Sequence, residues 1–434
     1  MANTPESVPV GAHLVLEVGP VAHGGHCVAR HLGQVVFVRH TLPGEQVRAV
    51  VTEVGAGGKF LRADAVDVLR AAPERVPAPC PWAGPGLCGG CDWQHVDLAA
   101  QRDLKAAVVV EQFARLADLD LTDHLGHPVP VEAVPGDQDG LGWRTRVEFA
   151  VDHGGRPGLR RHRSHDIVPI EDCLIADGRV IGTGVLGTTY PGAAAVDVIA
   201  PSVGDPVIVE VPGEGTPDDT ASGDGAQKGL APRTRATTPV PVVRERVAVA
   251  GGDLELGVSA RGFWQVHPGA ATTFVTTVLD WLQPRAGEHA VDLYAGVGLF
   301  AAALADRVGT EGSVLAIESD RVATDNARGN LAQRPWVRVQ RDRVDRALRR
   351  LLRSEQEIDL VVLDPPRTGA GRQVCRDIAG LRPRSIGYVA CDPAALARDV
   401  GYLSNYGYRL RDLRAFDAFP MTHHMELVAV LDPV

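Results

Sequence analysis

Asp292-Leu-Tyr-Ala-Gly296-Val-Gly298-Leu-Phe300 is the stretch that decides the fold of this 434-residue chain. It follows an apolar run predicted to be a strand at 288–294, and it opens a run with helical spacing at 299–307. Gly296 and Gly298 allow a tight turn and let a ligand approach the backbone closely. A strand that passes through such a turn into a helix predicts an α/β domain with its ligand at the carboxyl ends of the strands.

The alternation of strand and helix continues to the end of the chain. Strands are predicted at 288–294, 313–317, 337–340, 358–363 and 385–390, and helices at 299–307, 320–333, 371–380 and 393–402. Strands separated by helices imply a parallel, doubly wound sheet. Two last strands, at 408–416 and 425–431, follow each other in hairpin order and predict an antiparallel edge.

The chain before residue 256 has a different pattern. Residues 11–70 contain short alternating strands with glycine turns, which predict a small OB-like β-barrel of a kind that often binds oligonucleotides. A helix is predicted at 97–118 with Asp97 as its cap, and a hairpin around Gly154 and Gly155. We expect three parts: a barrel at 5–72, a small α+β middle domain at 73–255 with a disordered loop near 212–240, and an α/β domain at 256–434.

Composition limits the classes of function. The formal net charge of −10 excludes a wholly basic nucleic-acid binder but leaves room for a local basic face. The most basic stretch, at 143–175, contains Arg144, Arg146, Arg156, Arg160, Arg161, His162, Arg163 and His165, and phosphate contacts or a solvated surface would both explain it. The sequence has no run of 18 apolar residues, and its start lacks the pattern of a signal peptide. We expect a cytosolic protein with no membrane association and no evident obligate protein partner.

A second acid supports a nucleotide site at the glycine turn. Glu318 ends the next predicted strand about 20 residues later, where an acid can bind ribose hydroxyls. This spacing suits NAD, FAD or S-adenosylmethionine. Ala301 occupies the position of the third glycine of the dinucleotide pattern. A cofactor without a pyrophosphate needs less of that glycine-rich cradle, so we favour S-adenosylmethionine over NAD.

Cys391 lies where the apolar run 386–390 gives way to a helix-starting Asp392-Pro393. A thiol at the carboxyl end of a strand and beside a helix N-terminus is exposed to substrate, in a field that favours the thiolate. Another predicted strand ends at Asp364. Two adjacent strand ends, one acidic and one nucleophilic, predict an active site on the sheet. The alternative is that Cys391 is a small buried apolar side chain.

A cluster of cysteines precedes the predicted helix at 97–118. Cys80, Cys88 and Cys91 lie within twelve residues, and Cys173 offers a distant fourth thiol. Four thiolates suit either a tetrahedral zinc ion or an iron–sulfur cluster, and the spacing by itself slightly favours zinc. Cys27 and Cys375 are assigned to packing.

Five segments that occur in one order carry a family resemblance. They are Gly262-Phe-Trp-Gln265-Val, Asp292-Leu-Tyr-Ala-Gly-Val-Gly298, Asp364-Pro-Pro-Arg-Thr-Gly369, Cys391-Asp-Pro393 and His424-Met-Glu426. Together they resemble the RNA 5-methyluridine methyltransferases, which have a class I methyltransferase sheet and use S-adenosylmethionine on ribosomal or transfer RNA. The N-terminal barrel resembles the TRAM domain of that family, and the cysteine cluster resembles the 4Fe-4S site of its ribosomal-RNA members.

The resemblance implies a role for particular residues. Cofactor contacts would fall on Gln265, Tyr294, Gly296, Gly298, Glu318 and Asp364, the nucleophile on Cys391, the general base on Glu426, and the 4Fe-4S ligands on Cys80, Cys88, Cys91 and Cys173. Two positions depart from the family pattern, because Asp392 and Leu299 stand where many members have asparagine. An anion at Asp392 would raise the pKa of the neighbouring thiol unless a hydrogen bond or the helix N-terminus offsets it.

The resemblance also implies the reaction. A thiolate on carbon 6 of uracil makes carbon 5 nucleophilic enough to take a methyl group, and a base then removes the carbon 5 proton. The target uridine has to leave its base stack to reach the site. The expected partner is structured RNA, with 23S ribosomal RNA favoured over transfer RNA. A non-catalytic RNA-binding or assembly factor and a methyltransferase with another target are the alternatives.

Overall fold

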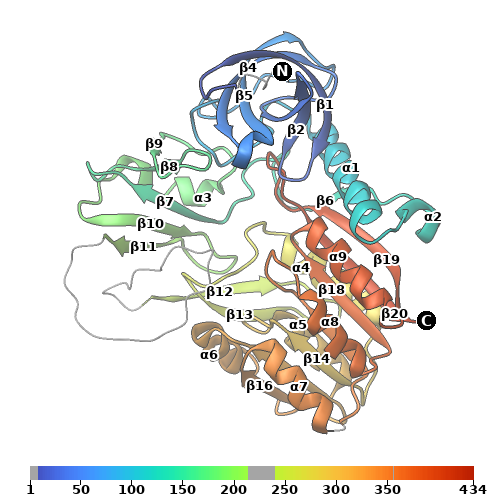
Figure 1. The fold of residues 1–434 in the computed structure, drawn as a ribbon. Coiled ribbons are helices and arrows are strands. Elements are labelled where there is room, and N and C mark those ends of the chain that lie inside the picture. The colour runs from blue at the N-terminus through green and yellow to red at the C-terminus, as the bar shows by residue number, and fades with distance from the viewer. Residues whose placement is uncertain (1–7, 214–239, 355) are drawn as a thin grey trace.

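The structure is a computed structural model that describes residues 8–213, 240–354 and 356–434 (Figure 1). Most of the segment 212–240, predicted to be a disordered loop, lies outside the described residues. In Figure 1 the N-terminal barrel lies at the top, the middle sheet at the left, and the large C-terminal sheet below. None of the described helices is long and apolar enough to cross a membrane.

An eight-stranded sheet forms the C-terminal part, in the order β16-β15-β14-β17-β18-β20-β19-β6. Strands β14 to β18 run parallel, and β20 lies antiparallel to both of its neighbours. The predicted doubly wound sheet with an antiparallel edge is therefore confirmed. Its strands are β6 (Val131–Ala133), β14 (His289–Leu293), β15 (Ser313–Glu318), β16 (Val337–Arg341), β17 (Leu360–Leu363), β18 (Ser385–Ala390), β19 (Tyr408–Asp417) and β20 (Glu426–Pro433).

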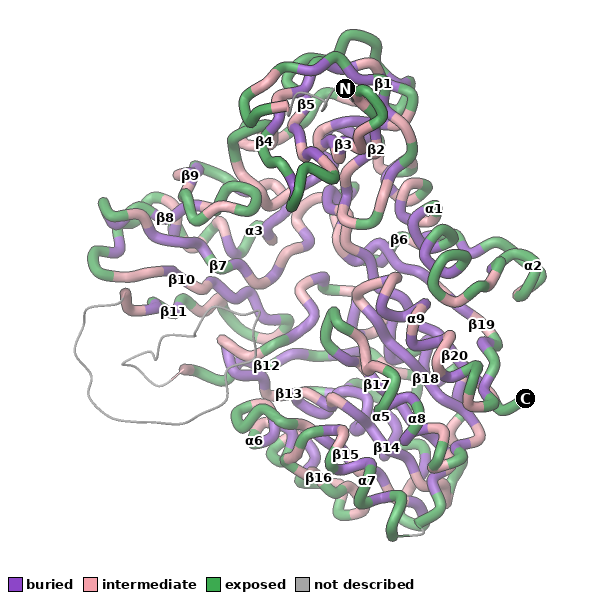
Figure 2. The backbone as a smooth tube through the Cα atoms, viewed as in Figure 1, coloured by how far each residue is buried: buried purple, intermediate pink, exposed green. Residues whose placement is uncertain are grey.

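Helices cover both faces of this sheet. One face packs against α4 (Ala270–Leu282), α5 (Leu299–Val308) and α6 (Arg321–Asn330). The other packs against α1 (Leu98–Leu116), α7 (Val344–Ser354), α8 (Gly371–Gly380) and α9 (Pro393–Ser404). Because both faces are covered, the central strands are largely buried and mostly apolar. Every residue of β17 and β18 is buried, as the purple tube shows in Figure 2.

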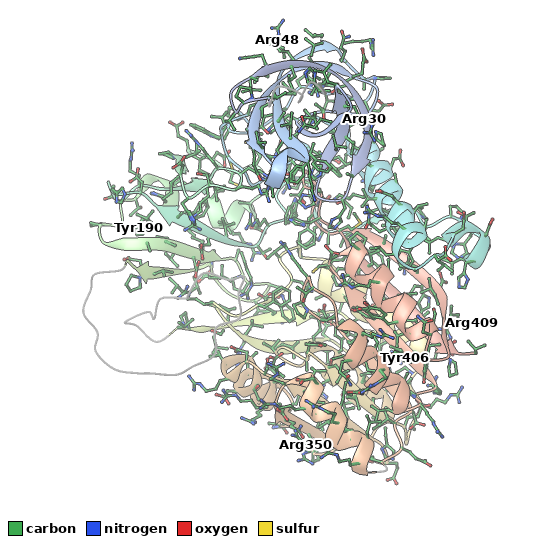
Figure 3. The ribbon with its side chains drawn as sticks, in the orientation of Figure 1. Arg30, Arg48, Tyr190, Arg350, Tyr406 and Arg409 are labelled. Atoms are coloured by element: carbon green, nitrogen blue, oxygen red, sulfur yellow. The ribbon has the colours of Figure 1, made fainter. Side chains whose placement is uncertain are left out.

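The N-terminal part is a closed barrel in the order β1-β2-β3-β5-β4. Its strands are β1 (His13–Ala22), β2 (His26–His31), β3 (Gln34–Arg39), β4 (Gln46–Val54) and β5 (Phe60–Arg70), with the short helix η1 (Ala56–Gly58) before β5. Apolar side chains alternate into the barrel, while Arg30 and Arg48 project outward from it (Figure 3). Strand β2 was not predicted, and Cys27 within it is buried as expected.

The middle part is a sheet in the order β11-β10-β7-β8-β9, beside a separate two-stranded sheet. The predicted hairpin around Gly154 and Gly155 joins β7 to β8. The strands are β7 (Arg146–Val151), β8 (Pro157–Arg160), β9 (Ile167–Pro169), β10 (Ala193–Ile199), β11 (Val207–Pro212), β12 (Val242–Val247) and β13 (Leu254–Ser259). The short helices are α2 (Leu121–Leu125), α3 (Gly178–Ile181) and η2 (Val185–Gly187).

Helix α1 connects the middle region to the large sheet. Its predicted cap is confirmed, because the Asp97 carboxylate accepts hydrogen bonds from the N–H groups of Ala99 and Ala100. The helix packs on α9, and β6 downstream of it pairs with β19. These elements precede the methyltransferase-like sheet in sequence but lie with it in space, so the division at residues 72 and 255 stays a proposal.

Candidate active site

The predicted nucleophile and base lie next to each other at the carboxyl end of the large sheet. Cys391 follows β18, and Glu426 begins β20, which is the antiparallel neighbour of β18. Ala390 of β18 pairs with Leu427 of the antiparallel strand β20. Cys391 and Glu426 are the next residues on the two chains, so they lie across from each other. Asp364 follows β17, the neighbour of β18 on the other side. Strand topology therefore gathers a thiol and two carboxyl groups from three separate parts of the sequence.

These three groups share one electrostatic environment. Burial, together with the charges of Glu426 and Asp364, raises the pKa of the Cys391 thiol to about 12. Burial raises the pKa of Asp364 to about 7, and burial and the charge of Asp364 raise the pKa of Glu426, which is 4% exposed. Arg367 acts in the opposite direction on the pKa of both Cys391 and Glu426. The expectation that the helix N-terminus favours the thiolate is wrong for the free protein, because burial and two carboxyl groups outweigh it.

Cys391 lines a cavity of about 200 Å³ between the large sheet and the barrel. One wall consists of Cys391, Asp392 and Pro393, at the start of α9. The opposite wall includes His23 and its neighbours in the turn between β1 and β2. The barrel is therefore part of the candidate active site.

Asp392 caps the helix that follows the nucleophile. One carboxylate oxygen accepts the N–H of Ala395, and the other lies 2.9 Å from Nε2 of His23 in the barrel. Burial opposes ionisation, but the hydrogen bond from His23 and the helix N–H groups lower the pKa of Asp392. The same bond raises the pKa of His23. The negative charge beside the thiol is thus compensated by a partner from another part of the fold, and Asp392 is the last of the causes that raise the pKa of Cys391.

The glycine turn has the geometry expected of a ligand-binding loop. Tyr294, Gly296 and Gly298 all have positive φ angles, of 62°, 55° and 91°. A side chain at Gly298 would place its Cβ 2.9 Å from Cδ1 of Leu331, so glycine is needed there. The Glu318 carboxylate accepts the N–H of Gly296 at 3.0 Å and thereby holds the turn against the end of β15.

Gln265 lies between β13 and α4 and is buried. Its side chain forms no hydrogen bond with other residues that the structure describes, so its predicted cofactor contact stays a prediction. The backbone beside it is fixed, because O of Val266 accepts hydrogen bonds from both N–H and Oγ1 of Thr145.

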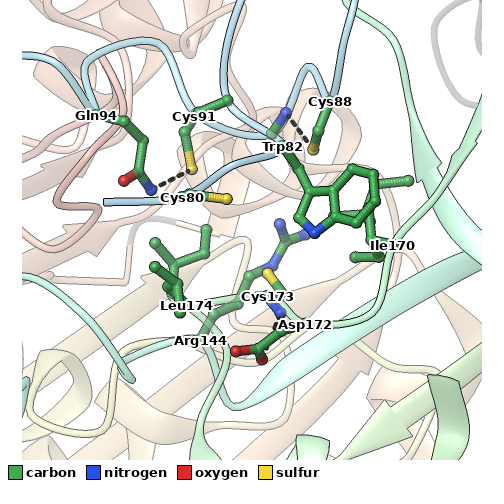
Figure 4. A pocket seen from close by; sticks show the side chains of 14 residues that line it. Cys80, Trp82, Cys88, Cys91, Gln94, Arg144, Ile170, Asp172, Cys173 and Leu174 are labelled. Carbon is green, nitrogen blue, oxygen red and sulfur yellow. Dashed lines mark hydrogen bonds between the residues drawn. The ribbon is translucent and has the colours of Figure 1, made fainter. Parts of the chain in front are cut away.

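Cysteines from two segments line a separate pocket (Figure 4). Cys80, Cys88, Cys91 and Cys173 all border it, and their sulfur atoms project into the same space. All four are free thiols, and Arg144 borders the pocket with them. Within the described ranges, no three cysteine, histidine or carboxylate side chains converge on a site for a single metal ion. A role of these cysteines in metal binding stays a prediction.

Comparisons with known proteins identify the family. A model of the TRAM domain matches residues 9–66, and a model of tRNA (Uracil-5-)-methyltransferases matches residues 231–433. An uncharacterised RNA methyltransferase of Streptomyces coelicolor is 51% identical to this chain, over 98% of this chain and 93% of the relative. The chain belongs to the RNA (uracil-5-)-methyltransferase family.

Two further relatives of this RNA (uracil-5-)-methyltransferase differ in their RNA target. The 23S rRNA (uracil(1939)-C(5))-methyltransferase of Chromohalobacter salexigens is 34% identical, over 96% of this chain and 88% of the relative. The tRNA (uracil-54, C5)-methyltransferase of Pyrococcus abyssi, solved with S-adenosyl-L-homocysteine, is 22% identical and covers 96% of this chain and 100% of its own, with a TM-score of 0.66. At this identity the likeness shows a shared fold, which confirms the class I methyltransferase architecture.

The surroundings of the glycine turn fit a cationic cofactor. Asp292 is fully buried, and its Oδ1 has no hydrogen-bond partner among the described residues. Burial, and the charges of Asp364 and Glu318, raise its pKa well above the ordinary value. A cation bound near this turn would offset the charges of Asp364 and Glu318 and so stabilise the Asp292 carboxylate. The methyltransferase thus presents an acidic cradle of the kind that a sulfonium cofactor requires.

Sequence reasoning missed Asp399, which fixes the loop after Asp364. This fully buried carboxylate accepts the hydroxyl of Tyr388 at 2.7 Å and the N–H groups of Ala370 and Gly371 at 2.6 and 3.2 Å. A Cβ at Gly369 would come within 2.6 Å of the same carboxylate. The sequence feature that could have indicated this role is the position of Asp399 among the buried, mostly apolar residues of α9.

Sequence reasoning also missed Lys105, which anchors the segment leading to Glu426. Its ammonium group, buried in α1, lies 2.5 Å from Oδ1 of Asp417 and donates to O of Phe419 at 3.2 Å. Asp417 ends β19, and Phe419 lies in the segment between β19 and β20, so the pair positions the chain that leads to Glu426. Removing one partner of such a buried pair would leave an uncompensated charge. The sequence feature that could have indicated this role is the position of Lys105 on the apolar side of the helix predicted at 97–118.

Proposed function

We propose that this methyltransferase adds a methyl group to carbon 5 of a uridine in 23S ribosomal RNA, with Cys391 as nucleophile and Glu426 as general base. One observation carries the proposal: strand pairing gathers the Cys391 thiol and the Glu426 and Asp364 carboxyl groups at one sheet edge, where Cys391 lines a cavity. A non-catalytic RNA-binding factor would not need this convergence.

The chemistry follows from what each side chain can do. Cys391 loses its proton and its sulfur bonds to carbon 6 of the uracil, which makes carbon 5 electron-rich. S-adenosylmethionine, when bound, supplies the methyl group that carbon 5 takes. Glu426 then removes the remaining proton from carbon 5, and the bond between sulfur and carbon 6 breaks to release the thiolate. Cysteine suits this cycle because it is both a strong nucleophile and a good leaving group.

The pKa values of Cys391 and Glu426 are both raised, so binding of the cofactor and the RNA has to lower them before the two groups can react. In the free protein, burial and neighbouring carboxyl groups raise the pKa of both Cys391 and Glu426 and so disfavour their charged forms. A cationic cofactor beside Asp364 would offset the negative charge that raises both pKa values. Arg367 lowers them from the other side. We infer that the reacting groups ionise when the acidic cradle is filled, so the thiol is protected until RNA and cofactor are present.

The cofactor residues follow the same logic. Glu318 would bind the ribose hydroxyls through its carboxylate, which already holds the turn at Gly296. Tyr294 and Gln265 would contact the nucleoside and methionine ends, and Asp364 would lie between cofactor and target base. The barrel and the middle domain would hold the RNA. The exposed arginines of the middle domain, such as Arg160 and Arg161, pair only with exposed acids, and such pairs exchange readily for phosphates.

The choice of ribosomal RNA rests on the relatives. Full-length relatives at 34% and 32% identity are named 23S rRNA uracil-5 methyltransferases. Deleting the gene should remove 5-methyluridine from one position of 23S ribosomal RNA, detected by mass-spectrometric mapping of RNase fragments. The gene with Cys391→Ala should fail to restore the modification, whereas the wild-type gene should restore it. Loss of 5-methyluridine from transfer RNA, with 23S RNA unchanged, would instead assign a transfer-RNA substrate.

We also propose that Cys80, Cys88, Cys91 and Cys173 hold a 4Fe-4S cluster. The support is that four free thiols line one pocket, together with Arg144, whose charge would offset the negative charge of a thiolate-bound cluster. Zinc bound by the same thiols is the competing occupant. The cluster would hold the segment 80–91 against the middle sheet and so shape the RNA-binding surface, since methyl transfer itself needs no electron carrier.

Metal analysis distinguishes these occupants. Protein purified without oxygen should contain about four iron atoms and four acid-labile sulfides per chain. Cys173→Ala should lose the iron and the visible absorbance of the cluster, because Cys173 is the ligand from the distant segment. Cys27→Ala, which changes a buried barrel thiol outside the pocket, should retain both. One equivalent of zinc without sulfide in the wild-type protein would contradict the cluster.

A further inference from the structure

A second cavity lies between the barrel and the cysteine segment, apart from the one that Cys391 lines. It has a volume of about 540 Å³ and is open to solvent on one side. Ala65, Val66 and Val68 of β5 form one wall, and residues 75–78, 83–85, 91–92 and 94–95 form the others. This volume lies within the range of sites that bind small organic groups. Nothing in the proposed chemistry uses this cavity.

Three residues that line the cavity each have a buried side-chain atom without a hydrogen-bond partner among the described residues. Nε2 of His95, Nε2 of His40 and Oε1 of Gln94 are buried, and none has a hydrogen-bond partner among the described residues. His95 is 8% exposed, and the two imidazole rings lie 6.2 Å apart. Buried polar atoms are nearly always paired, so three orphans around one cavity indicate a missing hydrogen-bonding ligand.

The charges around the cavity are already compensated. Arg75 forms a two-point pair with the buried Glu45, at 2.5 and 2.7 Å. The carboxylate of Asp92 accepts Nδ1 of His423 at 2.6 Å. Burial lowers the pKa of His40 to about 3 and that of His95 to about 4, so both rings are neutral at physiological pH. Among the described residues that line the cavity, a phosphate would find no cation without an acid partner, whereas an uncharged ring with donors and acceptors would find partners.

The position of the cavity relates it to the RNA. Trp93 and His423 line the cavity that contains Cys391, while Asp92 and His95 line the second cavity. A single stretch of chain therefore separates the two, and the bond between Asp92 and His423 crosses between them. An RNA whose target uridine entered one cavity would pass its neighbouring nucleotides near the other, because adjacent residues of one stretch, 92–95, line the two cavities.

We propose that the cavity between β5, the segment 75–78 and residues 91–95 binds an unstacked nucleobase of the substrate RNA, a nucleotide other than the methylated uridine. The base would lie against Val66 and Val68, with its edge hydrogen-bonded to His40, Gln94 and His95. Proteins that bind single-stranded nucleic acid commonly use such apolar and aromatic platforms. This inference rests on the proposed RNA substrate, and it adds a second point at which the enzyme reads the RNA.

The test pairs changes in the RNA with changes in the cavity. The probe is a synthetic stem–loop carrying the uridine mapped in the deletion strain, with one base at a time replaced by an abasic site. Binding is measured by fluorescence anisotropy with S-adenosylhomocysteine, so no turnover is needed. For the wild-type protein, one abasic site away from the target should raise Kd about tenfold.

Two variants decide the outcome. Ala78→Trp fills the cavity from its exposed rim, and His95→Leu removes a hydrogen-bonding ring. Each should weaken binding of the intact RNA about tenfold and abolish the penalty of that one abasic site. Ala56→Trp, at an exposed barrel position bordering neither cavity, should keep the wild-type pattern. Abasic penalties that persist unchanged in both cavity variants would overturn the proposal, and a wild-type protein that binds the RNA without methylating it would contradict the proposed function alone.

Discussion

Cys391→Ala is expected to abolish methyl transfer, by roughly 10⁴-fold or more, and to eliminate any covalent adduct between protein and RNA. In the proposed reaction, the cavity beside Cys391 would bring a uracil to the only thiol at this sheet edge among the described residues. Without sulfur on carbon 6, carbon 5 of uracil is too weak a nucleophile for the methyl group. Transfer of labelled methyl groups and a denaturing gel of protein with labelled RNA measure the two effects.

The matched control is Cys375→Ala, which removes a thiol from α8 that is fully buried and lines neither cavity. That variant should keep its adduct. The Cys391 variant should still bind S-adenosylhomocysteine in a calorimeter, because the cofactor turn is built from β14 and β15. Methyl transfer by Cys391→Ala at the wild-type rate would eliminate covalent catalysis while leaving the family assignment intact.

Glu426→Gln is expected to lower kcat by roughly 10²–10⁴-fold and to accumulate the covalent adduct. Methyl transfer to carbon 5 can still occur, but the remaining proton on carbon 5 has no base to remove it. The substitution keeps the size of a side chain that is 4% exposed, so packing changes little. Adduct on a denaturing gel, carrying a labelled methyl group, is the signature that separates this role from a structural one.

The pH profile provides a second readout for Glu426. Burial and Asp364 raise its pKa, so the ionised fraction that can act as a base increases as the pH rises. The wild-type rate should therefore climb from neutral to alkaline pH, and decay of the accumulated adduct in Glu426→Gln should lose that dependence. Glu132→Gln, a control that changes a half-buried acid paired with Arg414 on the edge strand β6, should behave as wild type. Normal turnover without adduct in Glu426→Gln would assign the base to another residue.

Patterns within a few residues correctly predicted those helices and strands whose ends coincide with a clear change in the sequence, such as a glycine or the end of an apolar run. Strand β18 and helix α8 were placed with their observed bounds, because an apolar run and a glycine-delimited segment define them. Helix α7 was missed because six of its 11 residues are charged or polar, although Val344, Ala347, Leu348 and Leu351 keep helical spacing. Strand β2 was missed because its short, histidine-flanked sequence lacks a clear alternation.

The sequence allowed the residues of the candidate site to be predicted, but it did not allow the shifts in their pKa values to be predicted. Motifs placed Cys391, Asp364 and Glu426 at strand ends, and the topology brings those ends together. The sign of the shift in the pKa of Cys391 could not be predicted, because it depends on burial and on carboxyl groups that are distant in sequence. The same holds for Lys105 and Asp417, whose pairing spans more than 300 residues.

The hydrogen bond from His23 to Asp392 gives the barrel a second role. The turn between β1 and β2 forms one wall of the cavity and holds the carboxylate that caps the helix behind the nucleophile. The barrel is therefore not an interchangeable accessory that could be removed to leave a smaller working enzyme. A protein without the barrel would lose the contacts that the barrel is proposed to make with RNA. It would also lose part of the structure that surrounds Cys391. Binding of the substrate and positioning of the nucleophile would therefore depend on the same turn of the barrel.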